Sequence, residues 1–265
     1  MSKEQSIGIF DSGFGGLTAM RVLRQLLPQE NIVYFGDTAR LPYGNKSADT
    51  IIRYCLENAS FLIDQQVKVL LIACHSACTA ALDPLRSSFE IPILSISEPG
   101  ISEVVKATRS NKIGILGTRA TISSGVYQQQ IQTALPHASI YSVACPMFVP
   151  LVEEGFVDHG VSEIIAREYL QPLIHHHVDT VLLGCTHYPL LQPLLQRLLG
   201  DDVTLIDPAH SCALETLQLL HDRDWLNPQT TPSQYTFYAS DDPDKFRHLG
   251  QTFLDLPIEK VFQKH

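Results

Sequence analysis

Short runs of apolar residues alternate along the chain with longer amphipathic stretches. The apolar runs are rich in Val, Ile and Leu, which is typical of strands buried on both faces of a sheet. They predict strands at residues 7–10, 31–36, 67–73, 92–96, 112–116, 139–144, 179–184 and 203–206. The amphipathic stretches predict helices at residues 17–27, 49–66, 125–134, 161–177 and 190–199. Strands that alternate with crossover helices indicate an α/β fold with doubly wound parallel sheets.

The chain also contains an internal repeat. Residues 7–12 (IGIFDS) recur 106 positions later as residues 113–118 (IGILGT). The apolar strand before Cys74 recurs before Cys185, 111 positions later. Because these elements recur in the same order at nearly one offset, we expect two pseudosymmetric copies of one α/β unit.

The repeat sets the expected domain boundaries. Residues 98–207 hold the second copy and are predicted to form the second domain. Residues 1–97 are predicted to form the first domain together with residues 208–265. The last stretch contains a strand-like segment at 234–239 and a helix-like segment at 243–253, which we expect to pack back onto the first copy.

Composition excludes several classes of function. The 265 residues carry a formal net charge of −9, and no Lys or Arg cluster stands out, so we expect neither a nucleic-acid nor a membrane partner. No apolar run approaches the roughly 18–20 residues of a membrane span, and the N-terminus shows no signal-peptide pattern. The 6 Cys are dispersed rather than paired in a framework. Together these features predict a soluble cytoplasmic protein.

Two of the cysteines occupy equivalent places in the repeat. Cys74 and Cys185 each end an apolar strand and precede a helical segment, where free N–H groups stabilise a thiolate. An isolated Cys is more often a small buried hydrophobe, and Cys55, Cys78 and Cys212 keep that interpretation. If the copies face each other, two thiols approach one ligand from opposite sides. Inversion of a carbon stereocentre needs that arrangement.

One further cysteine and two kinds of cofactor compete with this interpretation. Cys145 also ends a strand, but its repeat partner is Asp37 rather than a cysteine. Zinc is not expected, because Cys74-His75 and the Cys-x-His spacing at Cys185 are unusual for a zinc site. No Lys ends an apolar strand of the repeat, which argues against a pyridoxal Schiff base. We therefore predict no metal and no cofactor.

Several polar side chains stand beside the strand ends. Asp11 follows the first strand, His187 lies two residues after Cys185, and Glu153 is a weaker acidic candidate. Each is also compatible with a structural role, such as helix capping by Asp11. Hydroxyl groups at helix starts, where N–H groups bind carboxylates, come from Ser12, Ser76, Thr118, Thr121 and Thr186.

These motifs together resemble the glutamate racemases of the aspartate/glutamate racemase superfamily. The segments that carry the resemblance are 11–18 (DSGFGGLT), 37–44 (DTARLPYG), the Ala73-Cys74 segment and 184–191 (GCTHYPLL). The resemblance spans nearly the whole chain. It implies two pseudosymmetric α/β domains with the active site in the cleft between them, often in a homodimer. It also implies cofactor-independent conversion of L-glutamate to D-glutamate for peptidoglycan synthesis.

The resemblance also assigns roles to residues. It implies that Cys74 takes the α-proton from D-glutamate and Cys185 takes it from L-glutamate, with Asp11, His187 and Glu153 assisting. The matching substrate-binding positions are Ser12, Pro42, Tyr43, Gly44, His75, Ser76, Thr121 and Thr186.

One position departs from the family pattern. Family members usually have Cys-Asn-Thr where this chain has Cys74-His75-Ser76. Serine keeps the hydroxyl, but histidine replaces an amide that both donates and accepts hydrogen bonds. Two alternatives therefore stay open: a racemase for another amino acid such as aspartate, or a catalytically impaired member that acts as a binding protein.

Overall fold

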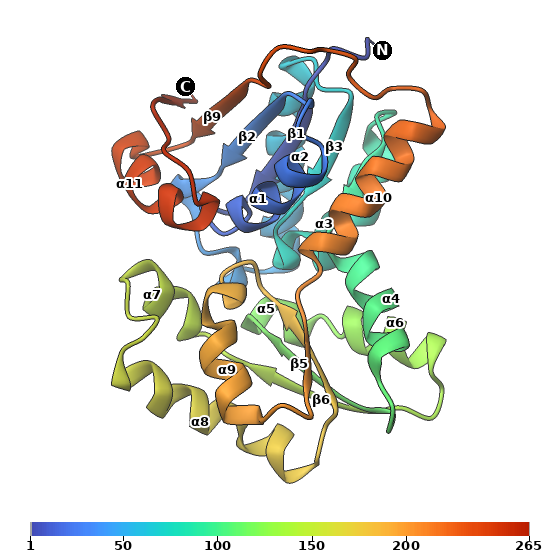
Figure 1. Cartoon of the computed structure of the whole chain (residues 1–265), viewed down its shortest axis with the longest axis vertical. Helices are drawn as coiled ribbons and strands as arrows, with labels where there is room; N and C mark the ends of the chain where they lie inside the picture. The colour runs from blue at the N-terminus through green and yellow to red at the C-terminus, as the bar shows by residue number, and fades with distance from the viewer. Residues whose placement is uncertain (1, 265) are drawn as a thin grey trace.

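A computed structural model of the chain, which describes residues 2–264, contains two parallel β-sheets stacked along the long axis of the molecule (Figure 1). The predicted doubly wound α/β fold is therefore confirmed. None of the helices in residues 2–264 is long and apolar enough to cross a bilayer.

The first sheet has six parallel strands in the order β10-β9-β2-β1-β3-β4. In chain order they are β1 (Ile7–Asp11), β2 (Ile32–Gly36), β3 (Val69–Ile72), β4 (Ile93–Ser95), β9 (Tyr235–Ala239) and β10 (Val261–Gln263). The segment predicted at 234–239 thus pairs with β2, from which it is separated by about two hundred residues of sequence. The short strand β10 was not predicted, because three residues carry too little periodicity to be recognised.

The second sheet has four parallel strands in the order β6-β5-β7-β8. They are β5 (Lys112–Gly117), β6 (Ser139–Ala144), β7 (Thr180–Gly184) and β8 (Thr204–Ile206). The central strand β5 pairs with β6 and β7, as β1 pairs with β2 and β3 in the first sheet. The repeat seen in the sequence is therefore a repeat of strand order.

Helices cover both faces of each sheet (Figure 1). Around the first sheet lie α1 (Leu17–Leu26), α2 (Ala48–Asp64), α3 (His75–Ser88), α10 (Ala209–Asp222) and α11 (Pro243–Leu254). Around the second lie α4 (Ser97–Ala107), α5 (Arg119–Ser123), α6 (Val126–Ala134), α7 (Phe148–Glu153), α8 (Gly160–His175) and α9 (Gln192–Leu199). The helix predicted at 190–199 is divided, because a 3₁₀ turn at Tyr188–Leu191 precedes α9.

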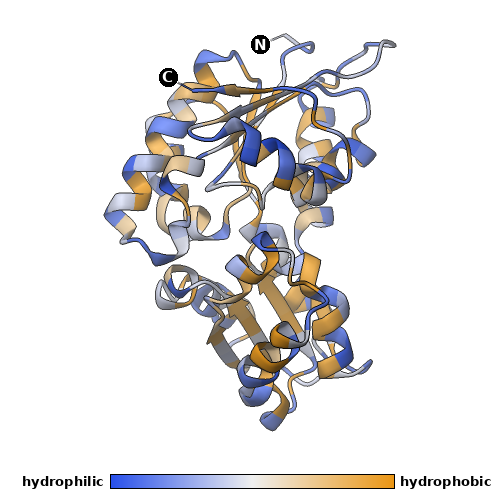
Figure 2. Cartoon of the chain, turned by 90° about the vertical axis from the view of Figure 1, so that its left-hand side faces the viewer, coloured by the Kyte–Doolittle hydropathy of each residue, from blue (hydrophilic) through white to orange (hydrophobic). Residues whose placement is uncertain are grey.

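The strands are apolar on both faces because each sheet lies between two layers of helices. All five residues of β1 and of β7 are buried. In β7, Leu182 belongs to a core with α4 and α6, whereas Val181 and Leu183 belong to the larger core on the opposite face. Figure 2 shows central strands of the second sheet in orange, with both orange and blue segments on the helices beside them. This burial holds the carboxyl ends of the strands in fixed positions.

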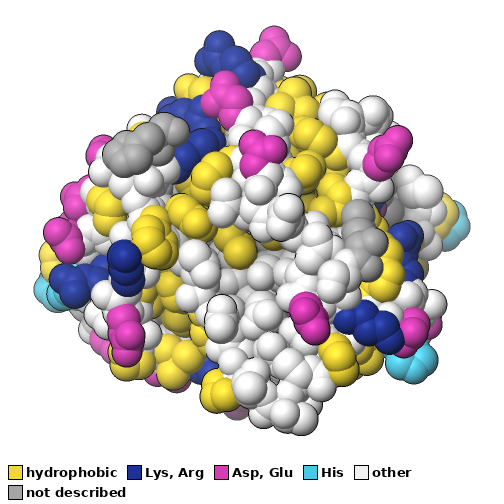
Figure 3. Space-filling model, turned by 90° about the horizontal axis from the view of Figure 1, so that it is seen from above, with side chains coloured by type: hydrophobic (Ala, Val, Ile, Leu, Met, Phe, Trp, Pro, Cys, Tyr) yellow, Lys and Arg dark blue, Asp and Glu magenta, His cyan; other side chains and the backbone are white. Residues whose placement is uncertain are grey.

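The surface has no dominant charge on the face seen from above. Lys, Arg, Asp and Glu side chains are interspersed around the rim of this face, and uncharged atoms fill its centre (Figure 3). Mixed charge of this kind gives no extended field for a polyanion.

Candidate functional site

The carboxyl ends of the strands of both sheets surround one small cavity. Its volume is about 20 Å³, close to the space of a single water molecule. Cys74 and Cys185 both line it. The other residues that line the cavity are Ser12, Gly13, Leu41, Pro42, Tyr43, Gly44, His75, Ser76, Thr118, Val149, Glu153, Thr186 and His187.

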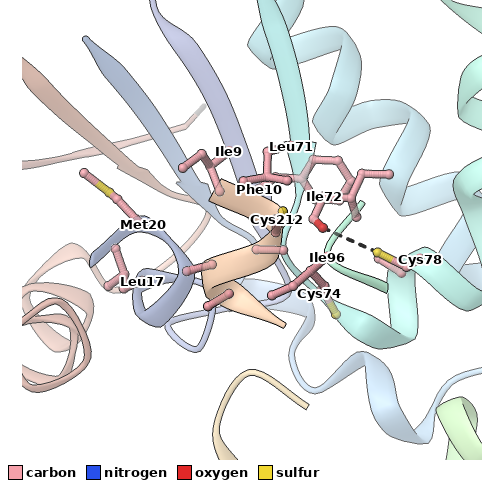
Figure 4. Close-up of a cluster of buried hydrophobic side chains, with 14 of the residues drawn as sticks. Ile9, Phe10, Leu17, Met20, Leu71, Ile72, Cys74, Cys78, Ile96 and Cys212 are labelled. Carbon is pink, nitrogen blue, oxygen red and sulfur yellow. Dashed lines mark hydrogen bonds between the residues drawn. The ribbon is translucent and has the colours of Figure 1, made fainter. Parts of the chain in front are cut away.

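Cys74 lies between the end of β3 and the first turn of α3. It caps α3 with an extended backbone, and its thiol lies 3.6 Å from the Ser12 hydroxyl. Figure 4 shows its sulfur directed away from the labelled hydrophobic side chains, whereas the Cys78 thiol donates to the carbonyl of Ile72. Burial, together with the negative charge of Asp11, raises the pKa of Cys74 to about 12. The thiol form is therefore favoured until a cation approaches.

Cys185 follows β7 and has an imidazole beside it. The sulfur lies 3.9 Å from Nδ1 of His187, and burial raises the pKa of this thiol well above its ordinary value. Nε2 of His187 lies 3.0 Å from Oε1 of Glu153, the last residue of α7. Thiol, imidazole and carboxylate thus form a chain along which a proton can move.

Asp11 lies at the end of β1 and connects the two halves of the molecule, where each half is one sheet with the helices around it. Its carboxylate accepts a hydrogen bond of 2.9 Å from the Gly13 N–H and one of 3.4 Å from the Thr186 hydroxyl. Complete burial raises the pKa of this carboxyl group, and nearby His187 acts in the opposite direction. Asp11 does not line the cavity but lies directly behind Thr186, which does.

A cluster of three hydroxyl groups also connects the two halves. The Ser76 hydroxyl lies 2.9 Å from that of Thr118 and 3.2 Å from that of Thr121. The Thr118 side chain also accepts the Thr121 N–H and so caps α5. Ser76 belongs to the first half and the two threonines to the second. Thr121 therefore reaches the cavity only through its neighbours.

The loop at residues 42–44 forms one wall of the cavity. The Tyr43 hydroxyl donates to the Asp37 carboxylate and accepts from Asn58 at 2.9 Å, so this side chain points into the protein. The backbone of Gly44 packs against Thr118, because a Cβ at Gly44 would lie 2.6 Å from that of Thr118. This loop therefore offers a ligand its backbone, and not the Tyr43 hydroxyl.

His75 lines the cavity beside Cys74 and is bound by a residue of the other half. Its Nδ1 is hydrogen-bonded to the hydroxyl of Tyr127 on α6. Burial lowers the pKa of His75 to about 3, so its ring is neutral near pH 7.

All but two of the predicted site residues line this cavity, and the exceptions, Asp11 and Thr121, bind residues that do. Cys145 does not line it, and its thiol donates to the Val143 carbonyl. Thr118 was named with the hydroxyl groups but not assigned to binding, although the repeat pairs it with Ser12. Nothing in the sequence singled out Tyr127.

The arrangement is suited to proton exchange with a ligand held between two thiols. Each thiol comes from the equivalent strand of its own sheet, and both contact the same small space. Within residues 2–264, no three His, Cys, Asp or Glu side chains are grouped in a way that would hold a metal ion.

Comparison with known proteins places the chain in a family. The model of the Asp/Glu/Hydantoin racemase family matches residues 19–216. A protein of Syntrophus aciditrophicus (strain SB) named glutamate racemase is 46% identical over 96% of each chain. The crystal structure of glutamate racemase from Francisella tularensis in complex with D-glutamate superposes with a TM-score of 0.93, at 38% identity, and covers 99% of this chain and 98% of that one.

A third relative agrees with these two. Glutamate racemase from Thermus thermophilus, in complex with β-chloro-D-alanine, gives a TM-score of 0.90 at 37% identity and covers 100% of this chain and 98% of that one. The chain belongs to the Asp/Glu/Hydantoin racemase family.

Proposed function

We propose that the chain interconverts L- and D-glutamate without a cofactor and supplies D-glutamate for peptidoglycan synthesis. The observation that carries this proposal is the pair of thiols, Cys74 and Cys185, at equivalent strand ends and on one cavity. The relatives named glutamate racemase, with 46% identity for one of them, support the choice of substrate.

In the proposed reaction one cysteine is a thiolate and the other a thiol. With L-glutamate, the Cys185 thiolate takes the α-proton and the electron pair of the C–H bond stays on the α-carbon. The Cys74 thiol then gives its proton to the opposite face, which forms D-glutamate and leaves a Cys74 thiolate. The reverse reaction exchanges these roles, so the two directions share one path.

The surroundings of the thiols support their role as bases. A thiolate in a buried site is a stronger base than one in water, because burial raises the pKa of both cysteines. The ammonium group of a bound amino acid supplies the positive charge that favours the thiolate. We assign Asp11 to assist Cys74, and His187 with Glu153 to assist Cys185.

Neutral groups would bind the substrate. None of the residues that line the cavity in the described part of the chain is Lys or Arg. N–H groups at the start of α3 and the hydroxyls around Ser76 are the donors available to carboxylates. We assign substrate binding to Ser12, Pro42, Tyr43, Gly44, His75, Ser76, Thr121 and Thr186, and add Thr118.

Substrate entry would require the two halves to separate. A cavity of about 20 Å³ holds one water molecule and is far smaller than an amino acid. We propose that the halves that move are residues 98–207 and residues 1–97 with 208–265, in line with the strands of the two sheets. The homodimer and the cytoplasmic location stay predictions.

Circular dichroism tests the proposal directly. Purified protein with L-glutamate and no added cofactor should reduce the signal to zero as the racemic mixture forms. In D₂O, deuterium should enter the α-carbon of the product. A constant signal at high protein concentration would reject the proposed function.

The departure at His75 makes two other outcomes informative. Faster turnover of L-aspartate than of L-glutamate would assign aspartate as the substrate. Tight binding of glutamate without α-deuteration would instead indicate an impaired family member that acts as a binding protein.

A further inference from the structure

A buried hydrogen bond joins the two halves of the molecule beside Cys74. His75 is the first residue of α3, Tyr127 is the second residue of α6, and Nδ1 of the imidazole meets the phenol hydroxyl. The ring centroids lie 5.9 Å apart, so the rings themselves are not stacked face to face. Tyr127 is fully buried and His75 is 2% exposed. Water therefore does not compete for this bond.

The ring of Tyr127 is fixed by packing, and its hydroxyl is fixed by one hydrogen bond. Its ring packs in the core that contains Ile113 and Ile131, so the second half of the molecule determines where its hydroxyl lies. Among residues 2–264, Nδ1 of His75 is the hydrogen-bond partner of this hydroxyl. A fully buried phenol proton without an acceptor is costly, so the Tyr127 hydroxyl donates to this nitrogen.

The direction of the bond determines which nitrogen of His75 carries a proton. A neutral imidazole has one N–H, and its other nitrogen is an acceptor. If Tyr127 donates to Nδ1, the proton of the ring lies on Nε2. Nδ1 is occupied and His75 lines the cavity, so Nε2 is the ring nitrogen left for a ligand.

We propose that Tyr127 is a positioning residue that holds His75 as the Nε2–H tautomer, so that His75 donates one hydrogen bond to a carboxylate of the bound amino acid. This inference rests on the proposed function. A fixed donor matters at this site, because no Lys or Arg among the described residues lines the cavity and neutral donors must bind the substrate.

The tautomer can be read without substrate and without any variant. In a ¹⁵N-resolved NMR spectrum of the imidazoles of the full-length protein, Nδ1 of His75 should have the shift of an unprotonated acceptor nitrogen and Nε2 that of an N–H nitrogen. His75→Asn identifies the signals. The opposite tautomer in the wild-type protein would overturn the inference, whether or not the protein racemises glutamate.

Kinetics of a double-mutant cycle supply the second test. Tyr127→Phe should raise KM for glutamate about 3- to 10-fold, as loss of one directed hydrogen bond does, with a smaller change in kcat. In the His75→Asn background the same substitution should change KM less than about twofold, because an amide has no tautomers. Equal effects in both backgrounds would show that Tyr127 acts only on packing.

A matched control separates this effect from a general loss of a phenol. Tyr141 lies on β6 in the same half and stacks on His176 instead of facing the cavity. Tyr141→Phe should leave KM and kcat unchanged. If the wild-type protein fails to racemise glutamate while the Nε2–H tautomer is observed, the proposed function fails and the positioning role of Tyr127 stands.

Discussion

Nε2 of His187 lies 3.0 Å from Oε1 of Glu153, on the side of the imidazole opposite to Cys185. Both side chains are largely buried, with 6% and 14% of their surfaces exposed. The carboxylate therefore orients the ring beside Cys185. Cys74 has Asp11 nearby, and no imidazole among residues 2–264 is bonded to it, so the two sides of the site differ in how they handle a proton.

Glu153→Gln should lower kcat/KM about 10-fold, the low end of what assistance to an acid–base group supplies. The fall must be equal in both directions, because the two enantiomers have the same free energy in solution. With the Cys185 side impaired, the deuterium isotope effect should rise for α-deuterated L-glutamate and fall for α-deuterated D-glutamate. Glu154→Gln, at the exposed neighbouring position, is the control. Unchanged isotope effects would argue against a role on the Cys185 side.

Cys74→Ser and Cys185→Ser should each lower racemisation by about 10³-fold or more, because a serine hydroxyl is a far weaker acid and forms no useful alkoxide near pH 7. Circular dichroism with each enantiomer measures the loss. Cys145→Ala is the matched control, since Cys145 follows a strand of the second sheet but does not line the cavity. Full activity in either serine variant would remove that cysteine from the mechanism.

The pKa of His75 predicts how stability depends on pH. Burial lowers this pKa from an ordinary 6.5 to about 3, so the folded protein binds the proton more weakly than the unfolded chain. The stability that the neutral ring contributes is present above pH 6.5 and is lost as the pH falls toward 3. Between pH 7 and pH 4 the wild-type protein should lose about 3 kcal/mol more than His75→Asn.

Urea denaturation at several pH values measures this difference. A constant offset between the two proteins is expected from changed packing, and only the divergence with pH reports the buried imidazole. The same experiment with His175→Asn, at an exposed position, should give a curve parallel to that of the wild-type protein. Parallel curves for His75→Asn would contradict the prediction.

Gly15 marks a close approach between the halves that tolerates no side chain. A Cβ at this position would lie 2.2 Å from the Thr186 hydroxyl oxygen and 2.6 Å from Nδ1 of His187. Neither neighbour can move freely, since Thr186 binds Asp11 and His187 binds Glu153. Gly15→Ala should therefore cost about 1–3 kcal/mol in the free energy of unfolding and lower racemisation strongly.

Thermal unfolding and circular dichroism of glutamate test this substitution together. Gly160→Ala is the control, because a Cβ at Gly160 meets no atom within 4 Å. That variant should keep the stability and activity of the wild-type protein. If Gly15→Ala behaves in the same way, the halves do not need this close contact.

The local pattern of apolar residues was enough to predict much of the fold. The apolar runs identified β1, β5 and β7 because strands between two layers of helices must be apolar on both faces. The repeat identified the equivalent places of Cys74 and Cys185, because the strand before each cysteine has a similar sequence. The sequence pattern did not predict the short strand β10 or the 3₁₀ turn at Tyr188–Leu191, since three or four residues define no period.

The residue types at the ends of the strands could be read from the chain alone, because a parallel α/β topology brings those ends to one edge whatever the loops do. Which side chains meet across that edge became known from the three-dimensional structure. Thr186 binds Asp11 from 175 positions away, and His75 binds Tyr127 from 52 positions away. No local pattern encodes such pairs, because they depend on how the two sheets and their helices pack against each other.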